Sequence, residues 1–130
     1  MYAKEVVHQI ILFLNHHFPN MVSEDLFDLR LIMSELLYNA IIHGNKSDHL
    51  KQVHVNINLC ENNIYAKISD EGNGFNPNIV LGMGCIQSSE SFESSENGRG
   101  IRLVEALTDC IRFVDRGNVV EIHKRVKLNE

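Results

Sequence analysis

Several features that define common protein classes are missing from this sequence. No stretch approaches the roughly 18 to 20 uninterrupted apolar residues of a membrane-spanning helix. The first residues do not combine a basic region, an apolar stretch and a small-residue cleavage site, so no secretory signal is predicted. We therefore expect a cytoplasmic protein with no membrane partner. Prolines number only two, and no linker or internal repeat divides the 130 residues, which predicts a single domain spanning 1–130.

Basic residues and paired cysteines are also scarce. The 12 Lys and Arg residues are outnumbered by 17 Asp and Glu residues, and no basic run exceeds two residues. This argues against a nucleic-acid partner, since phosphate binding needs clustered positive charge. The three cysteines are odd in number and form no CxxC pair, which argues against a disulfide framework or a zinc ribbon. Buried or idle free thiols are the preferred interpretation.

The spacing of apolar residues predicts the secondary structure. Three- and four-residue spacing predicts a helix ending near residue 17, a second over 23–45 and a third over about 100–107. Gly44-Asn45 is predicted to end the second helix, because glycine reaches the left-handed conformation freely. Strict alternation predicts a hairpin of strands near 53–59 and 64–69, then two more strands near 110–114 and 119–126. This order predicts an α+β fold, a two-layer α/β sandwich with the helices on one face of a mostly antiparallel sheet.

A polar ridge runs along the second predicted helix. Glu35, Asn39 and His43 recur every four residues, about 100° around the helix from the apolar row that contains Leu36 and Ala40. A carboxylate and an amide one turn apart can place a general base beside a metal ligand. A solvated polar stripe has the same spacing, so the ridge alone leaves both interpretations open.

Two glycine motifs flank a long stretch without periodicity, residues 72–100, which contains a Ser- and Glu-rich cluster. The first motif, Asp70-Glu71-Gly72-Asn73-Gly74, directly follows a predicted strand, and its glycines allow a close approach of the backbone to a ligand. The second, Gly98-Arg99-Gly100, precedes a predicted helix, where free N–H groups can bind an anion. Each motif alone is equally compatible with an ordinary loop or helix entry.

Taken together and in this order, the three motifs resemble the N, G1 and G2 boxes of the GHKL (Bergerat-fold) ATPases. Within that superfamily the chain is similar to the small anti-sigma-factor serine/threonine kinases. The similarity is carried by SELLYNAIIHGN at 34–45, GRGIRLVEALTD at 98–109 and GNVVEIHKRV at 117–126. It covers nearly the whole chain from Ser23 onward.

The resemblance implies an ATP or ADP site with Mg²⁺. In that site Asn39 completes the coordination of the metal, Glu35 is the general base for a serine or threonine hydroxyl, and Asp70 accepts a hydrogen bond from the adenine amino group. The Ser-rich stretch becomes an ATP lid. The residues assigned to cofactor binding on this basis are Asn39, His43, Asp70, Gly72, Gly74, Gly98, Arg99 and Gly100.

The function implied is that of an anti-sigma-factor protein kinase, which binds a sigma factor and phosphorylates a STAS-domain antagonist. A non-catalytic ATP-gated switch and the ATP domain of a split histidine kinase are the alternatives. The split histidine kinase is disfavoured because no phosphoacceptor helix pair precedes residue 1.

Two departures from the group qualify these expectations. The group's strand before the first helix is short or missing, which leaves a homodimer open. Asn118 and Val119 stand where the group often carries a threonine near the adenine.

Overall fold

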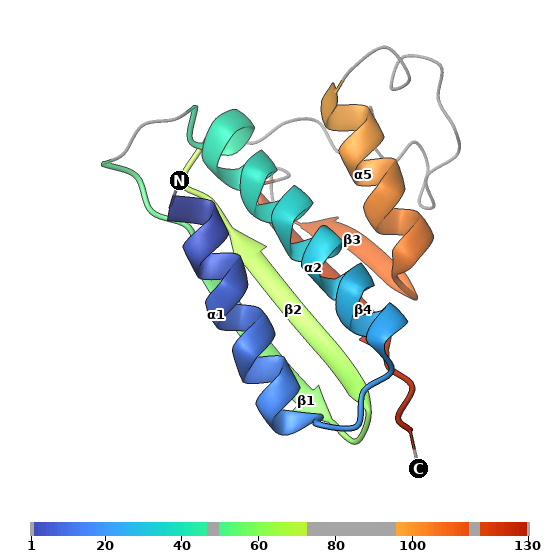
Figure 1. The fold of residues 1–130 in the computed structure, drawn as a ribbon. Coiled ribbons are helices and arrows are strands. Elements are labelled where there is room, and N and C mark those ends of the chain that lie inside the picture. The colour runs from blue at the N-terminus through green and yellow to red at the C-terminus, as the bar shows by residue number, and fades with distance from the viewer. Residues whose placement is uncertain (1, 47–49, 73–95, 115–117, 130) are drawn as a thin grey trace.

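The computed structural model describes residues 2–46, 50–72, 96–114 and 118–129, and these form two layers (Figure 1). One layer contains the helices α1 (Tyr2–His17), α2 (Ser23–Tyr38) and α5 (Glu96–Leu107), with a π-helix η1 (Asn39–Gly44) directly continuing α2. The other layer is a sheet of β1 (His54–Cys60), β2 (Asn63–Ser69), β3 (Cys110–Val114) and β4 (Val119–Arg125). No helix in the described part of the chain is long and apolar enough to cross a membrane.

The sheet is antiparallel throughout, with the order β1-β2-β4-β3. Cys60 pairs with Asn63 at the end of the first hairpin, so its loop has two residues. Ile68 of β2 lies opposite Val120 of β4, and both belong to the buried side of the sheet. Because side chains alternate along each strand, this register gives the sheet one helix-facing side and one open side. The predicted two-layer α+β fold is therefore confirmed.

The helices bury the apolar rows that the sequence predicted. In α1 the buried residues recur at three- and four-residue spacing, and α2 packs between α1 and α5 in front of the sheet (Figure 1). Burial of such a stripe against a sheet is the main source of helix stability in a domain of this size. The buried residues on the three helices include Val7, Ile10, Ile11, Leu14, Leu29, Ile32, Met33, Leu36, Leu37, Ile101 and Val104.

The helix ends differ from the prediction in two places. The second helix does not stop through a left-handed glycine at Gly44, because the residue with positive φ is Lys46, at 53°. Its last turn widens into η1, where the amide of Asn45 donates to the carbonyl of Ala40, five residues back. The third helix begins at Glu96, about four residues earlier than predicted.

The early start of α5 places Gly98 and Gly100 inside a helix. Each interior glycine costs a helix roughly 1 kcal/mol relative to alanine, which is why the sequence predicted a start after them. Packing of α5 against α2 outweighs this intrinsic preference, because Ile101 and Val104 are buried there. Cys60 and Cys110 are free thiols, as predicted, and of the two alternatives offered for them they are exposed and not buried. Cys85 lies outside the described residues.

Two leucines of α1 test this assignment of the core. Leu14 is fully buried, whereas Leu12, two residues earlier on the same helix, is 52% exposed. We expect Leu14→Ala to lower the free energy of unfolding by about 2–5 kcal/mol, because it leaves a cavity beneath α1. Leu12→Ala is the matched control and should lower it by less than about 1 kcal/mol. Urea denaturation measures both, and equal losses would contradict the placement of α1.

Candidate functional site

The polar residues predicted to carry chemistry gather at one end of the helical layer. There the end of α2, the π-turn η1, the residues after β2 and the first turns of α5 meet. η1 begins at Asn39 and ends at Gly44, so one turn of backbone connects two clusters of side chains. π-helical turns inside α-helices occur frequently at functional sites.

The first cluster contains Glu35, Asn39 and Gly100. A Cβ atom added at Gly100 would lie 2.5 Å from Oε2 of Glu35 and 4.0 Å from Nδ2 of Asn39. The absence of a side chain at residue 100 therefore lets α5 approach the carboxylate closely. The structure thus brings together the predicted general base, the predicted metal ligand and the last glycine of the second glycine motif.

The amide of Asn39 has spare hydrogen-bonding capacity. Its Nδ2 atom is buried and has no hydrogen-bond partner among the described residues. Buried polar atoms without a partner are rare in folded proteins and usually require an explanation such as a ligand. Rotating the side-chain amide so that Nδ2 and Oδ1 exchange places therefore breaks no hydrogen bond of Nδ2. In the rotated amide the oxygen can bind a cation.

The second cluster is built around Asp70, the first residue after β2. Its carboxylate lies directly against Gly44, where any Cβ atom would overlap it, and its Oδ1 accepts a 2.8 Å hydrogen bond from the amide of Gly72. Gly72 in turn approaches the carbonyl oxygen of Gly44 so closely that a side chain is excluded. Two backbone segments meet here around one carboxylate.

Burial raises the pKa of the Asp70 carboxyl above its ordinary value. The hydrogen bond from Gly72 and the positive charge of Lys51 act in the opposite direction and are weaker. A carboxylate kept partly out of water is a strong acceptor for an N–H donor, since few water molecules compete for it. The cluster therefore suits a ligand that presents such a donor.

Two asparagines that the sequence did not assign to the site hold this cluster in place. Asn45 is 2% exposed, and its side chain accepts a 2.7 Å hydrogen bond from the amide of Glu71 and donates to the carbonyl of Gln52. Asn118 lies opposite Asp70, and the backbone amide of Asp70 donates a 2.9 Å hydrogen bond to the backbone carbonyl of Asn118. The only sequence signal for Asn45 is its position directly after Gly44, and that pair predicts the end of a helix and not a site residue.

Asn118 also leaves an acceptor unused. Its Nδ2 faces the carbonyl of Asp70 at 3.4 Å, and its Oδ1 is buried with no partner among the described residues. The residue that departs from the group's threonine therefore contacts the second cluster directly.

Several predicted site residues are only partly described. Gly74 and the Ser-rich stretch predicted as a lid lie outside the described residues, as do the side chains of His43 and Arg99. The backbone of His43 lies in η1, where residues four apart no longer stack one turn above another, so the regular ridge ends at Asn39.

The second glycine motif also needs a correction. It forms the first turns of α5 rather than preceding a helix. Because the first four N–H groups of a helix have no intrahelical partner, the amides of Gly98 and Arg99 keep the predicted capacity for an anion.

Comparison with known proteins identifies the family. A family model described as the histidine kinase-like ATPase domain matches residues 3–124. The chain therefore belongs to the histidine kinase-like ATPase domain family. Curated relatives fall in the anti-sigma-factor kinase group, which confirms the resemblance stated from the three motifs.

Three relatives illustrate this similarity. The chain is 30% identical to the serine-protein kinase RsbW of Bacillus licheniformis over 104 residues, which are 78% of this chain and 65% of the relative. It is 28% identical to the anti-sigma F factor of Clostridium perfringens strain SM101 over 107 residues, 82% of this chain and 75% of that protein. Identity to the RsbW of Bacillus subtilis strain 168 is 28%, over 74% of this chain and 61% of the relative. The match thus spans just under two thirds of the length of the first relative.

The residues present fit a nucleotide with Mg²⁺, as the family implies. Asn39 has the free amide for a hard cation that takes few protein ligands, and Asp70 has a half-buried carboxylate for an amino group. Gly100 leaves open the space that a side chain of α5 would fill beside Glu35 and Asn39.

The glycines of the two clusters should respond differently to substitution. Gly72→Ala forces a Cβ atom into the backbone oxygen of Gly44, which cannot move aside, so we expect a loss of about 1–3 kcal/mol in the free energy of unfolding. In Gly100→Ala the new Cβ atom meets only the end of the flexible Glu35 side chain. Alanine is also a better helix former than glycine, which stabilises α5 by roughly 0.5–1 kcal/mol and offsets the cost of this contact. Thermal or urea denaturation compares the two, and a larger loss for Gly100→Ala would contradict the geometry.

Proposed function

We propose that this protein is an ATP-dependent protein serine/threonine kinase of the anti-sigma-factor type, which binds a sigma factor and phosphorylates a STAS-domain antagonist. The observation that carries the proposal is the contact between Glu35, Asn39 and Gly100, which sets a carboxylate beside an unpartnered amide at the start of a helix. The names of the relatives, serine-protein kinase and anti-sigma F factor, support the same activity. We further propose that residues 1–130 form one domain and act in the cytoplasm.

The chain's own residues have distinct parts in this reaction. Glu35 accepts the proton of the attacking hydroxyl, Asn39 holds the metal, and Asp70 orients the adenine through its amino group. The first turn of α5 supplies N–H groups for the phosphates. The bound Mg²⁺ supplies charge neutralisation on the phosphates. Positioning then accounts for most of the catalysis, as is usual for phosphoryl transfer.

The first test concerns nucleotide binding and its dependence on pH. The ionised form of Asp70 accepts the hydrogen bond, and burial raises its pKa, so affinity for ATP should fall as the pH decreases through that raised value. We expect Asp70→Asn to weaken ATP about tenfold or more at neutral pH, since a hydrogen bond to a charged group contributes roughly 1.5–3 kcal/mol. Calorimetric titration with Mg²⁺ measures both effects.

The same substitution should not destabilise the protein without ligand. A carboxyl whose pKa is raised by folding opposes folding once it ionises, so removing its charge keeps or increases the stability at neutral pH. Glu24→Gln, an exposed carboxylate on the first turn of α2, is the control for both measurements. A parallel loss of stability and affinity in Asp70→Asn would show that the residue is structural only.

The second test concerns catalysis. Glu35→Gln keeps the shape of the side chain and removes the general base, so we expect phosphate transfer to a cognate STAS protein to slow by about 10² to 10⁴-fold. ATP affinity should stay within about threefold of wild type, because the carboxylate acts on the hydroxyl and not on the nucleotide. Transfer from labelled ATP measures the rate. Intact ATP binding with no transfer by the wild type would favour the non-catalytic switch, and phosphate on a partner histidine would favour the split histidine kinase.

A further inference from the structure

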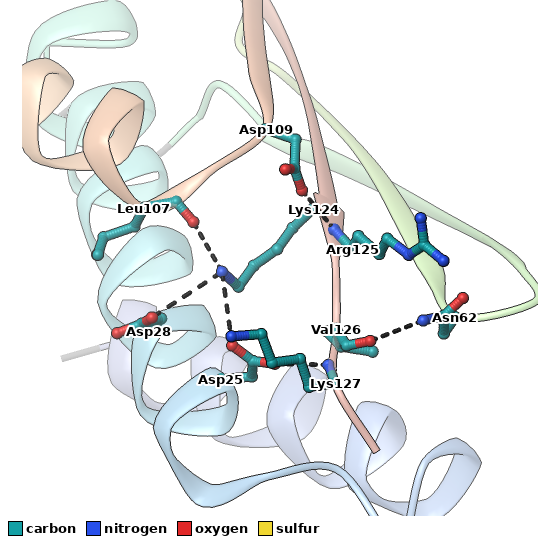
Figure 2. Close-up of polar contacts among 9 residues, drawn as sticks. All are labelled: Asp25, Asp28, Asn62, Leu107, Asp109, Lys124, Arg125, Val126 and Lys127. Atoms are coloured by element: carbon teal, nitrogen blue, oxygen red, sulfur yellow. Dashed lines mark hydrogen bonds and ion pairs between the residues drawn. The ribbon is translucent and has the colours of Figure 1, made fainter.

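A buried cation lies at the opposite end of the helical layer from the candidate site. Lys124 belongs to β4 but faces the helices, and it is only 7% exposed (Figure 2). Its Nζ atom donates a 2.8 Å hydrogen bond to the carbonyl of Leu107, the last residue of α5. It also lies 3.9 Å from one carboxylate oxygen each of Asp25 and Asp28, in the first turns of α2.

Lys124 supplies what α5 lacks at its C-terminus. The last four carbonyls of a helix have no intrahelical partner and carry a partial negative charge. Helices commonly place a basic residue in the last turn to compensate, but α5 has none there. The cation that caps this helix therefore comes from the neighbouring strand, 17 residues further along the chain.

The two carboxylates attach the start of α2 to the same cation. Asp25 is itself 6% exposed, and its Oδ2 accepts a 2.6 Å hydrogen bond from the amide of Lys127 (Figure 2). The remaining negative charge of the pair lies at the positive end of the α2 dipole. One buried group thus connects the end of α5, the start of α2 and the end of β4.

The other ends of the same two helices form the candidate site. α2 and α5 run antiparallel, since the start of α2 meets the end of α5 at Lys124, and the end of α2 meets Gly100 of α5 at Glu35. Gly100 is seven residues from Leu107, or about 10 Å along the helix at 1.5 Å per residue. A shift of α5 at Leu107 is therefore transmitted along one short helix to Gly100.

We infer that Lys124 is a positioning residue for phosphate binding: it holds α5 at a fixed axial position against α2 and so places Gly100, just after the first turn of α5, against Glu35 and Asn39. This inference rests on the proposed nucleotide site. Its consequence is selective, because the cluster around Asp70 is built from η1, the residues after β2 and Asn118 just before β4. α5 contributes nothing to the contacts described there. Lys124 should therefore influence the phosphates of a nucleotide and not its base.

The test compares ATP with adenosine on the intact protein. Lys124→Met keeps the length of the side chain and removes the charge, so we expect about tenfold weaker ATP binding with adenosine within about twofold of wild type, as small displacements of a binding group cost this much. Lys124→Arg should restore part of the ATP affinity. Asp28→Asn, which removes one of the two carboxylates, should act in the same direction more weakly and covers the case in which Lys124→Met does not fold.

Asn62→Ala is the matched control. Its side chain donates a 2.8 Å hydrogen bond to the carbonyl of Val126, at the same end of the sheet but without touching α5 (Figure 2). It should leave the ratio of ATP to adenosine affinity unchanged. Amide hydrogen exchange provides a second readout, and Lys124→Met should accelerate exchange in α5 more than in the β1–β2 hairpin.

Three results would overturn the inference. An unchanged ATP affinity in a folded Lys124→Met variant would contradict the positioning role. An equal loss for ATP and adenosine, shared by Asn62→Ala, would show a general loss of stability. If the wild type bound neither ligand, the proposed function itself would fail and this inference with it, a result that the wild-type titration alone separates from the first two.

Discussion

The burial of α2 is the constraint on which the rest of the structure depends. Leu29, Ile32, Met33, Leu36 and Leu37 are at most 2% exposed, so α2 is covered by the sheet and by helices on both flanks. A helix held so broadly has no freedom to rotate, because turning it would expose several large side chains at about 1.5–3 kcal/mol each. The polar residues at its C-terminal end are consequently fixed in direction by apolar packing several residues away.

The site follows from where this rigid helix stops. Past Tyr38 the backbone widens into η1, and the chain then contacts the residues after β2 through polar groups and bare backbone. At Gly44 and Gly72 the segments approach too closely for any side chain, and Asn45 replaces apolar packing with two hydrogen bonds. The region can therefore keep Asp70 partly out of water without surrounding it with hydrocarbon, which suits a group that must accept a hydrogen bond from a ligand.

The sequence predicted the layers, the strands and the buried rows correctly because these depend on periodicity alone, a local property. It also predicted that Glu35, Asn39, Asp70 and Gly100 belong together, through motif order and not through geometry. It missed the start of α5, where packing outweighs glycine propensity, and the π-turn, for which no residue pattern is diagnostic. Asn45 and Lys124 were missed for a different reason. Their partners are 7 to 99 positions away, and a single sequence contains no record of such pairs.

The buried ion cluster and the apolar core contribute differently to the site. Apolar burial is non-directional, so it holds α5 against α2 without specifying how far α5 has moved along its own axis. A hydrogen bond at 2.8 Å is directional, and the one from Lys124 to Leu107 specifies that position. Desolvating three charged groups costs much of the energy they gain from one another, so the cluster adds little net stability. Its physical effect is therefore on geometry: packing makes the two helices adjacent, and Lys124 determines which residues of α5 face Glu35 and Asn39.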